Sequence, residues 1–175
     1  MDNLSDYLKL IYSHVNDMLK FAEAKNAGLI VLNLTAIIAL LQLDSDNLLK
    51  FFIWIKYYIV ALNFCSTFFC LVGIYAQLRT SERKPAFDGN ENLLYFGDIA
   101  LLTPKEMLQK TSKKYNCNSI NLPFDEDLCR QIVIVSQIAL RKFRIFNIAM
   151  YFTIASIPPT IVCYWLFSKF FDPNK

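Results

Sequence analysis

An uncharged run near the amino terminus constrains the fold of this chain more than any other feature. The 18 residues from Asn26 to Leu43 contain no charged side chain. As an α-helix the run is about 27 Å long, which is close to the hydrocarbon thickness of a bilayer. Its polar interruptions are uncharged as well: Asn33, Thr35 and Gln42. Since a soluble core helix of this length normally carries a polar face, the run predicts a membrane span over residues 27–43.

Two later runs are also long enough to cross a bilayer. Residues 57–78 form a run of 22 uncharged residues, and residues 145–168 form a run of 24. Lysines and aromatic residues surround the start of the first of these, as is typical of a membrane interface: Lys50, Trp54, Lys56, Tyr57 and Tyr58. Pro158 and Pro159 are expected to kink the last run, with Ser156 or Thr160 bonding the freed carbonyls.

The composition agrees with an integral membrane protein. Hydrophobic residues make up 55% of the 175 residues, and the mean hydropathy is +0.32, which is high for a soluble domain. The alternative is an unusually apolar soluble helical bundle, although a chain of this length has much surface to cover with polar groups. The net charge of +3 is scattered along the sequence, so no nucleic-acid polymer is expected as a partner.

The cysteines and the single histidine argue against a disulfide framework, a metal site and the common catalytic sites. The five cysteines are odd in number and form no Cys-x-x-Cys pair, which favours a reducing compartment. Schemes that pair Ser or Cys with His would all depend on His14, the single histidine of the chain. We therefore expect no enzyme, no catalytic residue, no metal, no cofactor and no cleavable signal peptide.

Basic residues near the ends of the spans predict the orientation of the chain. Nine lie on the side of the amino terminus: Lys20, Lys25, Arg79, Arg83, Lys84, Arg130, Arg141, Lys142 and Arg144. Four lie on the other side: Lys50, Lys56, Lys169 and Lys175. The positive-inside rule then places the amino terminus in the cytosol and the carboxyl terminus outside.

These features predict an all-α membrane protein with three transmembrane helices. A small, mainly helical cytosolic module is expected between the second and the third. The expected segments are a cytosolic amphipathic helix (1–26), a transmembrane hairpin (27–78), a cytosolic sensor module (79–144), and a third transmembrane helix with a short tail (145–175). One long helix is expected to run from about Asp125 into the last span, because no helix breaker separates them.

Two heptad-like stripes mark the polar parts of the chain. The first contains Leu4, Leu8, Ile11, Val15, Met18 and Ala22, and the second contains Leu128, Ile132, Val135 and Ala139. Each stripe predicts an amphipathic helix. Either helix packs within its own protomer or provides a seam between copies, and the spacing alone leaves both alternatives open.

The segment before residue 104 is ambiguous, whereas the one after it is well marked. Residues 93–102 are compatible with a short strand or a buried loop, in which Gly97 would permit a sharp bend. Thr103, followed by proline and then by Glu106, forms a capping-box sequence. It predicts a helix that ends near Tyr115.

A set of aromatic and charged residues is the candidate ligand site. The set contains Arg79, Tyr95, Phe96, Asp98, Arg141 and Arg144. Tyr95, Phe96 or Tyr115 would stack on a base, and the arginines would pair with a phosphate. The alternatives are that the aromatic residues belong to the core and that the arginines are the positively charged flank of the spans.

Polar side chains also interrupt the spans themselves. The set contains Asn33, Asn63, Ser66, Thr67, Asn147 and Ser156. Hydrogen bonds between helices are the ordinary role of such residues, and lining a pore is the alternative.

The order of several motifs resembles the transmembrane effectors of Pycsar anti-phage defence. The motifs are the polar turn from Glu23 to Asn26, Tyr95-Phe-Gly-Asp-Ile99, Gln131-Ile132, Ser136, Ile138 and Arg141-Lys-Phe143. The similarity covers roughly residues 19–167. The element Tyr95–Ile99 and the element Arg141–Phe143 are together more specific than the short spans, because many small membrane proteins have short spans.

The resemblance implies a mechanism that composition does not. A uridylate or cytidylate cyclase partner makes cyclic CMP or cyclic UMP on infection, and the effector senses it and impairs the bacterial inner membrane, causing abortive infection. Three spans per copy are too few to enclose a polar pore, so a homo-oligomer in the lipid bilayer is expected. The alternative is a constitutive small membrane interaction or assembly protein, or a holin-like pore component, without a nucleotide ligand.

Overall fold

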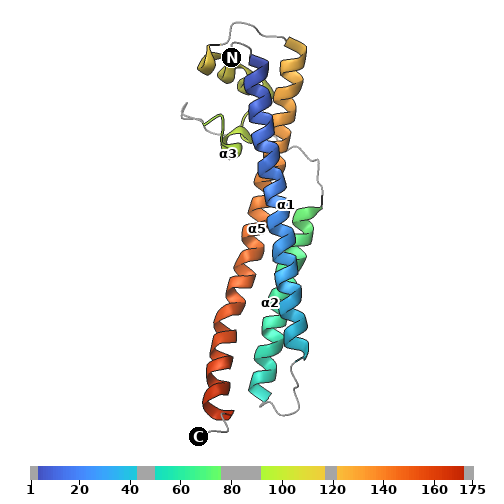
Figure 1. Ribbon diagram of the computed structural model, residues 1–175, viewed down its shortest axis with the longest axis vertical. Coiled ribbons are helices and arrows are strands. Elements are labelled where there is room, and N and C mark those ends of the chain that lie inside the picture. Colours follow the sequence, from blue (N-terminus) through green and yellow to red (C-terminus); the bar gives the residue numbers. More distant parts are fainter. Residues whose placement is uncertain (1–3, 43–49, 76–91, 117–121, 172–175) are drawn as a thin grey trace. The chain divides into compact units, whose positions relative to one another are not determined.

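The computed structural model describes residues 4–42, 50–75, 92–116 and 122–171, and within these ranges every regular element is an α-helix (Figure 1). The helices are α1 (Leu4–Gln42), α2 (Lys50–Ile74), α3 (Phe96–Ile99), α4 (Pro104–Tyr115) and α5 (Leu122–Phe171). Three of them, α1, α2 and α5, are long and apolar enough to cross a membrane. The predicted all-α fold with three long apolar helices is confirmed. The sidedness and the boundaries of the four segments stay predictions.

Helices α1 and α5 are longer than the spans they contain. Helix α1 continues through the polar turn from Glu23 to Asn26 without a break, because alanine, glutamate and lysine favour helix there and no proline intervenes. Helix α5 begins at Leu122, three residues before the predicted start at Asp125, and runs through Pro158 and Pro159. The expected single helix from the polar module into the last span is therefore confirmed.

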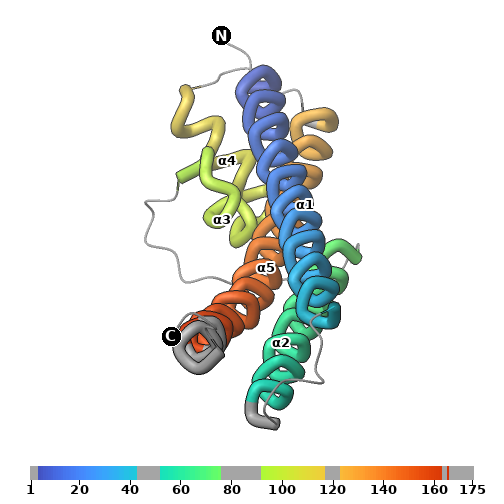
Figure 2. The backbone as a smooth tube through the Cα atoms, turned by 60° about the horizontal axis from the view of Figure 1, so that its bottom comes forward, coloured from blue at the N-terminus to red at the C-terminus, as the bar shows by residue number. Residues whose placement is uncertain are grey.

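The chain divides into two compact units, and α1 and α5 contribute to both. Unit 1 contains residues 1–23 and 76–143, and unit 2 contains residues 24–75 and 144–175. In unit 1, the first half of α1 and the first half of α5 run side by side in the same direction (Figure 2). Ser5 bonds Asp125, 120 positions later in the sequence, and Glu23 bonds Lys142, 119 positions later. The nearly constant separation shows that the two helices stay in register over this length.

The core of unit 1 contains residues of both predicted stripes together with residues of α3 and α4. Leu4, Leu8 and Val15 are fully buried, as are Cys129 and Ile132 on α5. The apolar faces of both helices are therefore covered within one chain, which confirms the alternative that the stripes pack on their own protomer. Met18, Leu128 and Val135 of the stripes are only partly buried, and a seam between copies stays a prediction.

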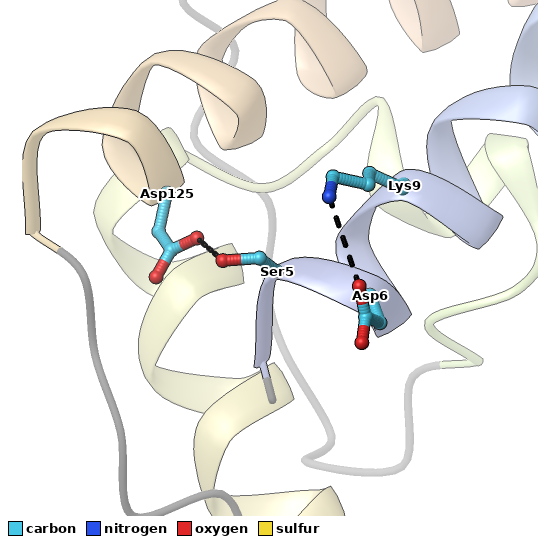
Figure 3. A network of polar contacts seen from close by, with 4 residues as sticks. All are labelled: Ser5, Asp6, Lys9 and Asp125. Carbon is cyan, nitrogen blue, oxygen red and sulfur yellow. Dashed lines mark hydrogen bonds and ion pairs between the residues drawn. The ribbon is translucent and has the colours of Figure 1, made fainter. Parts of the chain in front are cut away.

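A buried hydrogen bond joins the first turns of α1 and α5 in unit 1. The Ser5 hydroxyl donates to the Asp125 carboxylate at 2.7 Å, and both residues are buried. Figure 3 shows this bond beside the exposed Asp6–Lys9 ion pair, which lies within α1. A carboxylate in the first turn is favoured by the positive end of the helix dipole, so Asp125 sets the register of the two helices while it stabilises the start of α5.

Residues 93–102 form neither a strand nor a simple loop. They fold into the short helix α3 with turns on either side, and their apolar residues enter the core of unit 1: Leu93, Ile99 and Leu102. The next helix begins as predicted. Thr103 and Glu106 form a reciprocal capping box at the start of α4, and Asn116 ends the helix in the left-handed conformation with φ 49°.

Unit 2 contains the second half of α1, the whole of α2 and the second half of α5. Its small apolar core consists of Leu29, Cys70, Phe146 and Ala149. Many large apolar side chains face outward instead, among them Val31, Ile38, Phe64, Phe68 and Ile161. An apolar exterior is the pattern expected of helices that are solvated by lipid.

The two prolines of α5 are accommodated differently from the prediction. Pro158 and Pro159 remove the amide hydrogens that would bond the carbonyls of Ile154 and Ala155. The Ser156 hydroxyl donates to the Thr153 carbonyl at 2.7 Å. The Thr160 hydroxyl donates to the Ser156 carbonyl at 2.8 Å. Both hydroxyls bond backbone carbonyls of α5, but these are the neighbours of the carbonyls that the prolines leave free.

Candidate functional site

The predicted site residues Tyr95, Phe96 and Asp98 lie at the start of α3 in unit 1, with Tyr95 directly before the helix. Tyr95 is 49% exposed, and its ring lies tilted against that of Phe96 with 5.0 Å between centroids. Asp98 accepts a hydrogen bond from the backbone N–H of Asn92 at 2.9 Å. Its carboxylate therefore already has a structural role in holding the turn before α3.

Gly97 has a packing role rather than the predicted bending role. The residue lies within helix α3 and is buried. A Cβ atom added to it would lie 2.8 Å from Cζ of Tyr95, which is closer than such atoms approach without a shift. The absence of a side chain at Gly97 thus lets the Tyr95 ring lie over the backbone of α3.

A group of four aromatic rings connects α3 with the two long helices of unit 1. Phe96 stacks on Phe143 of α5 with 5.2 Å between centroids, and Phe143 lies 6.3 Å from Phe21 of α1. We call Phe21, Tyr95, Phe96 and Phe143 the aromatic group. Phe21 and Tyr95 are half-exposed, so the group presents ring surface at the outside of unit 1. Tyr115, by contrast, stacks on Tyr7 at 4.6 Å beside the core.

The predicted arginines are less closely grouped. Arg141 lies on α5 in unit 1 and is partly buried, while Arg144 is exposed and belongs to unit 2. Arg79 lies outside the described residues. The structure therefore places four of the six predicted residues in unit 1: Tyr95, Phe96, Asp98 and Arg141. Whether these residues bind a ligand stays a prediction.

Sequence reasoning missed Lys142 as a candidate site residue, although it lies in the Arg-Lys-Phe motif. The Lys142 side chain is only 8% exposed, and its ammonium lies 2.5 Å from a carboxylate oxygen of Glu23 on α1. The sequence places Glu23 in a polar turn with no sign of this partner. A lysine in the middle of a basic cluster gives no signal that it is buried, so the sequence could not single it out.

A second polar feature of α5 in unit 1 was also missed. The Gln137 amide donates to the Ala100 carbonyl at 3.3 Å, and this bond ties α5 to the end of α3. The other amide atom of Gln137, Oε1, and the Ser136 hydroxyl are buried without a hydrogen-bond partner among the described residues. Such buried polar atoms are uncommon in folded proteins, so the described residues satisfy this part of α5 incompletely.

Unit 2 holds a polar cluster between its three helices. Asn33 of α1 donates to the Ser66 hydroxyl of α2 at 2.8 Å. The Thr153 hydroxyl of α5 lies 2.8 Å from the Ser66 hydroxyl and 3.0 Å from the Asn33 carbonyl oxygen. All three residues are buried, and we call them the membrane polar cluster. The predicted bonding between helices is confirmed for Asn33 and Ser66, and Thr153 was missed.

Two other polar residues of the spans bond within their own helix. Asn63 donates to the Ile59 carbonyl and Thr67 donates to the Asn63 carbonyl, so both satisfy the backbone of their own helix. Asn147 is exposed. The membrane polar cluster is thus distinguished by side-chain bonds that join three separate helices.

The core of unit 1 contains a thiol that should be chemically silent. Burial raises the pKa of Cys129 from 9.0 to about 12, and the nearby carboxylates of Asp125 and Glu126 contribute to the rise. A thiol with so high a pKa is almost entirely protonated at pH 8, and the thiolate is the form that reacts. We expect iodoacetamide to leave Cys129 unmodified at pH 8 in the detergent-solubilised protein, with modification accelerating as the pH rises. Mass spectrometry of the digested protein measures this, and equal modification before and after denaturation in SDS would contradict the packing of unit 1.

Comparison with known proteins relates most of the chain to one family. A family model described as the Pycsar effector protein domain matches residues 7–168. The Pycsar effector protein RsPycTM of a Rhizobium species is 31% identical over 163 residues, which covers 87% of this chain and 92% of that protein. No solved structure matches.

Proposed function

This chain belongs to the Pycsar effector family, and from that membership we propose that it senses cyclic CMP or cyclic UMP and disrupts the membrane in which it is embedded. Anti-phage defence is the role that the family implies, and three helices long and apolar enough to cross a membrane support a membrane protein. The proposed setting is the bacterial inner membrane with the amino terminus in the cytosol. A uridylate or cytidylate cyclase supplies the signal, and the effector itself is not an enzyme.

The observation that carries this proposal is the extent of the family match. Residues 7–168 include nearly all of the described part of unit 1 and most of the three long helices in unit 2. A similarity between short apolar spans alone would relate many unconnected membrane proteins. This match also covers α3 and α4, so both the proposed sensor and the membrane-spanning helices are similar to the Pycsar effector domain.

The aromatic group and the cations near it suit a cyclic pyrimidine nucleotide. Exposed ring surface at Tyr95 and Phe21 is available to stack on a base, which contributes roughly 1–3 kcal/mol per base. Arg141 lies two residues before Phe143 on α5, and a guanidinium pairs well with a phosphate. In this proposal Tyr95, Phe96 and Arg141 form part of the ligand site.

The membrane response requires that the ligand favour an open state of unit 2. A ligand with equal affinity for the closed and open states would shift nothing. Helices α1 and α5 each continue from unit 1 into unit 2. A movement of their first halves would therefore move the second halves, which carry Asn33 and Thr153 of the membrane polar cluster. Because three spans cannot enclose a pore, the open state is proposed to involve several copies of the chain.

Purified protein in vesicles tests this function. We expect cyclic CMP or cyclic UMP to collapse an imposed membrane potential, measured with a voltage-sensitive dye, while cyclic AMP and cyclic GMP leave it intact. A leak that is the same with and without nucleotide would instead identify a constitutive, holin-like component. Mass measurement in nanodiscs, with and without nucleotide, should show more than one copy, and a monomer in both conditions would count against the oligomer.

A further inference from the structure

Unit 1 buries three side-chain hydroxyls in its described part, and one of them has no partner there. Ser5 donates to the Asp125 carboxylate at 2.7 Å. Thr111 donates to the Met107 carbonyl of its own helix, also at 2.7 Å. Ser136 is just as deeply buried, but its hydroxyl makes no hydrogen bond to any described residue. Ser136 is therefore the exception among the buried hydroxyls of this unit.

The surroundings of Ser136 on α5 are apolar. Ile132 lies one turn before it and Ala139 lies one turn after it, and both are fully buried. Ile132 also belongs to the apolar core of unit 1. A hydroxyl in such surroundings is destabilising, because it has lost its contacts with water and has gained no protein partner. An alanine at this position would fill nearly the same space without that cost.

The next residue, Gln137, connects the same turn of α5 to the end of α3. Its amide donates to the Ala100 carbonyl at 3.3 Å, which is slightly longer than the usual range of about 2.7–3.2 Å. Its amide oxygen is buried without a hydrogen-bond partner among the described residues. A small separation of the helices packed against this turn would admit water to both Ser136 and Gln137. The separated arrangement thus restores hydration that the packed arrangement withholds.

We propose that Ser136, together with the Gln137 amide oxygen, is a weak point built into unit 1 that lowers the cost of separating the helices packed on α5. The part that the ligand takes in this separation rests on the proposed function. A ligand shifts a protein only by the difference between its affinities for the two arrangements. A weak point in the packed arrangement therefore lowers the ligand concentration that the response requires.

Replacing Ser136 tests the weak point without any ligand. Ser136→Ala removes the unsatisfied hydroxyl, so local opening should become rarer, and the amides of α3 and of the first half of α5 should exchange with deuterium about 5-fold more slowly or slower still. Ser136→Cys should act in the same direction, since a thiol is similar in size and is buried at little cost. Hydrogen-exchange mass spectrometry of the full chain in detergent measures both variants, and circular dichroism confirms that they are folded.

Two serines of α1 provide matched controls. Ser13 is exposed, so Ser13→Ala reports only the higher helix propensity of alanine and should slow exchange by about 2-fold or less. Ser5→Ala should instead accelerate exchange at the start of α5, because it removes a hydrogen bond to the buried Asp125 carboxylate. One chemical change is thus expected to have three different effects, according to the partner of each hydroxyl.

The response to nucleotide tests whether the weak point serves the switch. In vesicles, Ser136→Ala should need about 5-fold more cyclic CMP or cyclic UMP than the parent for half-maximal loss of the membrane potential. Ser13→Ala should respond at nearly the concentration that the parent needs.

The outcomes separate this inference from the function on which it rests. Exchange in Ser136→Ala that is no slower than in Ser13→Ala would show that the hydroxyl is satisfied, and the weak point would be wrong. Slower exchange with an unchanged nucleotide requirement would overturn its role in the switch. If the parent responds to neither nucleotide, the proposed sensing fails, whereas the exchange rates still decide whether Ser136 weakens the packing of unit 1.

Discussion

Replacing Asn33 with leucine is expected to make vesicles that contain this protein leak without any ligand. Asn33 makes two of the hydrogen bonds that join α1, α2 and α5 in unit 2. Hydrogen bonds between membrane helices contribute about 0.6 kcal/mol on average and up to about 1.7 kcal/mol. Losing both should shift the balance between closed and open states by about 8-fold at the average value, and by more at the upper one. Dye-reported ion leakage in the absence of nucleotide measures the effect.

Asn63 offers a closely matched control for this experiment. It is the same residue type, is also buried and lies in the same unit, but its amide bonds the backbone of its own helix. Asn63→Leu should therefore leave the leak without nucleotide close to that of the parent. If Asn33→Leu leaks no more than Asn63→Leu, the membrane polar cluster does not hold the closed state.

Removing the Tyr95 ring is expected to abolish the response to cyclic CMP and cyclic UMP while membrane insertion remains intact. Tyr95 exposes about half of its surface, so it can stack on a base, and loss of one stacking ring weakens binding by roughly 1–3 kcal/mol. Gly97→Ala should act in the same direction, because the new Cβ atom would occupy space next to the Tyr95 ring. Membrane potential as a function of nucleotide concentration measures both variants.

Leu94→Ala is the control for the ring, since Leu94 is the neighbouring residue and is 46% exposed. It should respond to nucleotide as the parent does. Arg141→Ala is expected to weaken the response as well, because its guanidinium is proposed to pair with the phosphate. A normal response in both Tyr95→Ala and Arg141→Ala would show that the ligand site lies elsewhere.

Several properties of this protein were determined by the sequence alone. The length of the uncharged runs predicted three helices that can cross a membrane, because hydrophobicity and helix length are local properties of a segment. The capping box at Thr103 was predicted for the same reason, since its bonds join residues three positions apart. The order of short motifs, among them Arg141-Lys-Phe143, also indicated the family.

The identity of the short element before α4 was not accessible in this way. Residues 93–102 contain apolar residues at positions that suit a strand, a loop or a helix. Ile99 and Leu102 enter a core that also contains residues of α1 and α5, so contacts with distant parts of the chain selected the helix. Local propensity over ten residues is too weak to make that choice.

The partners of the buried polar residues were decided only by the tertiary structure. Lys142 is one of several lysines and arginines in its segment, and its burial against Glu23 depends on a partner 119 positions away. The bonds of Ser66 reach residues 33 and 87 positions away. In a membrane helix both the lipid-facing and the inward-facing side chains are apolar, so the pattern along the sequence does not show which face turns inward. That rotation, and with it the partner of every buried polar side chain, is determined by the packing of whole helices against one another.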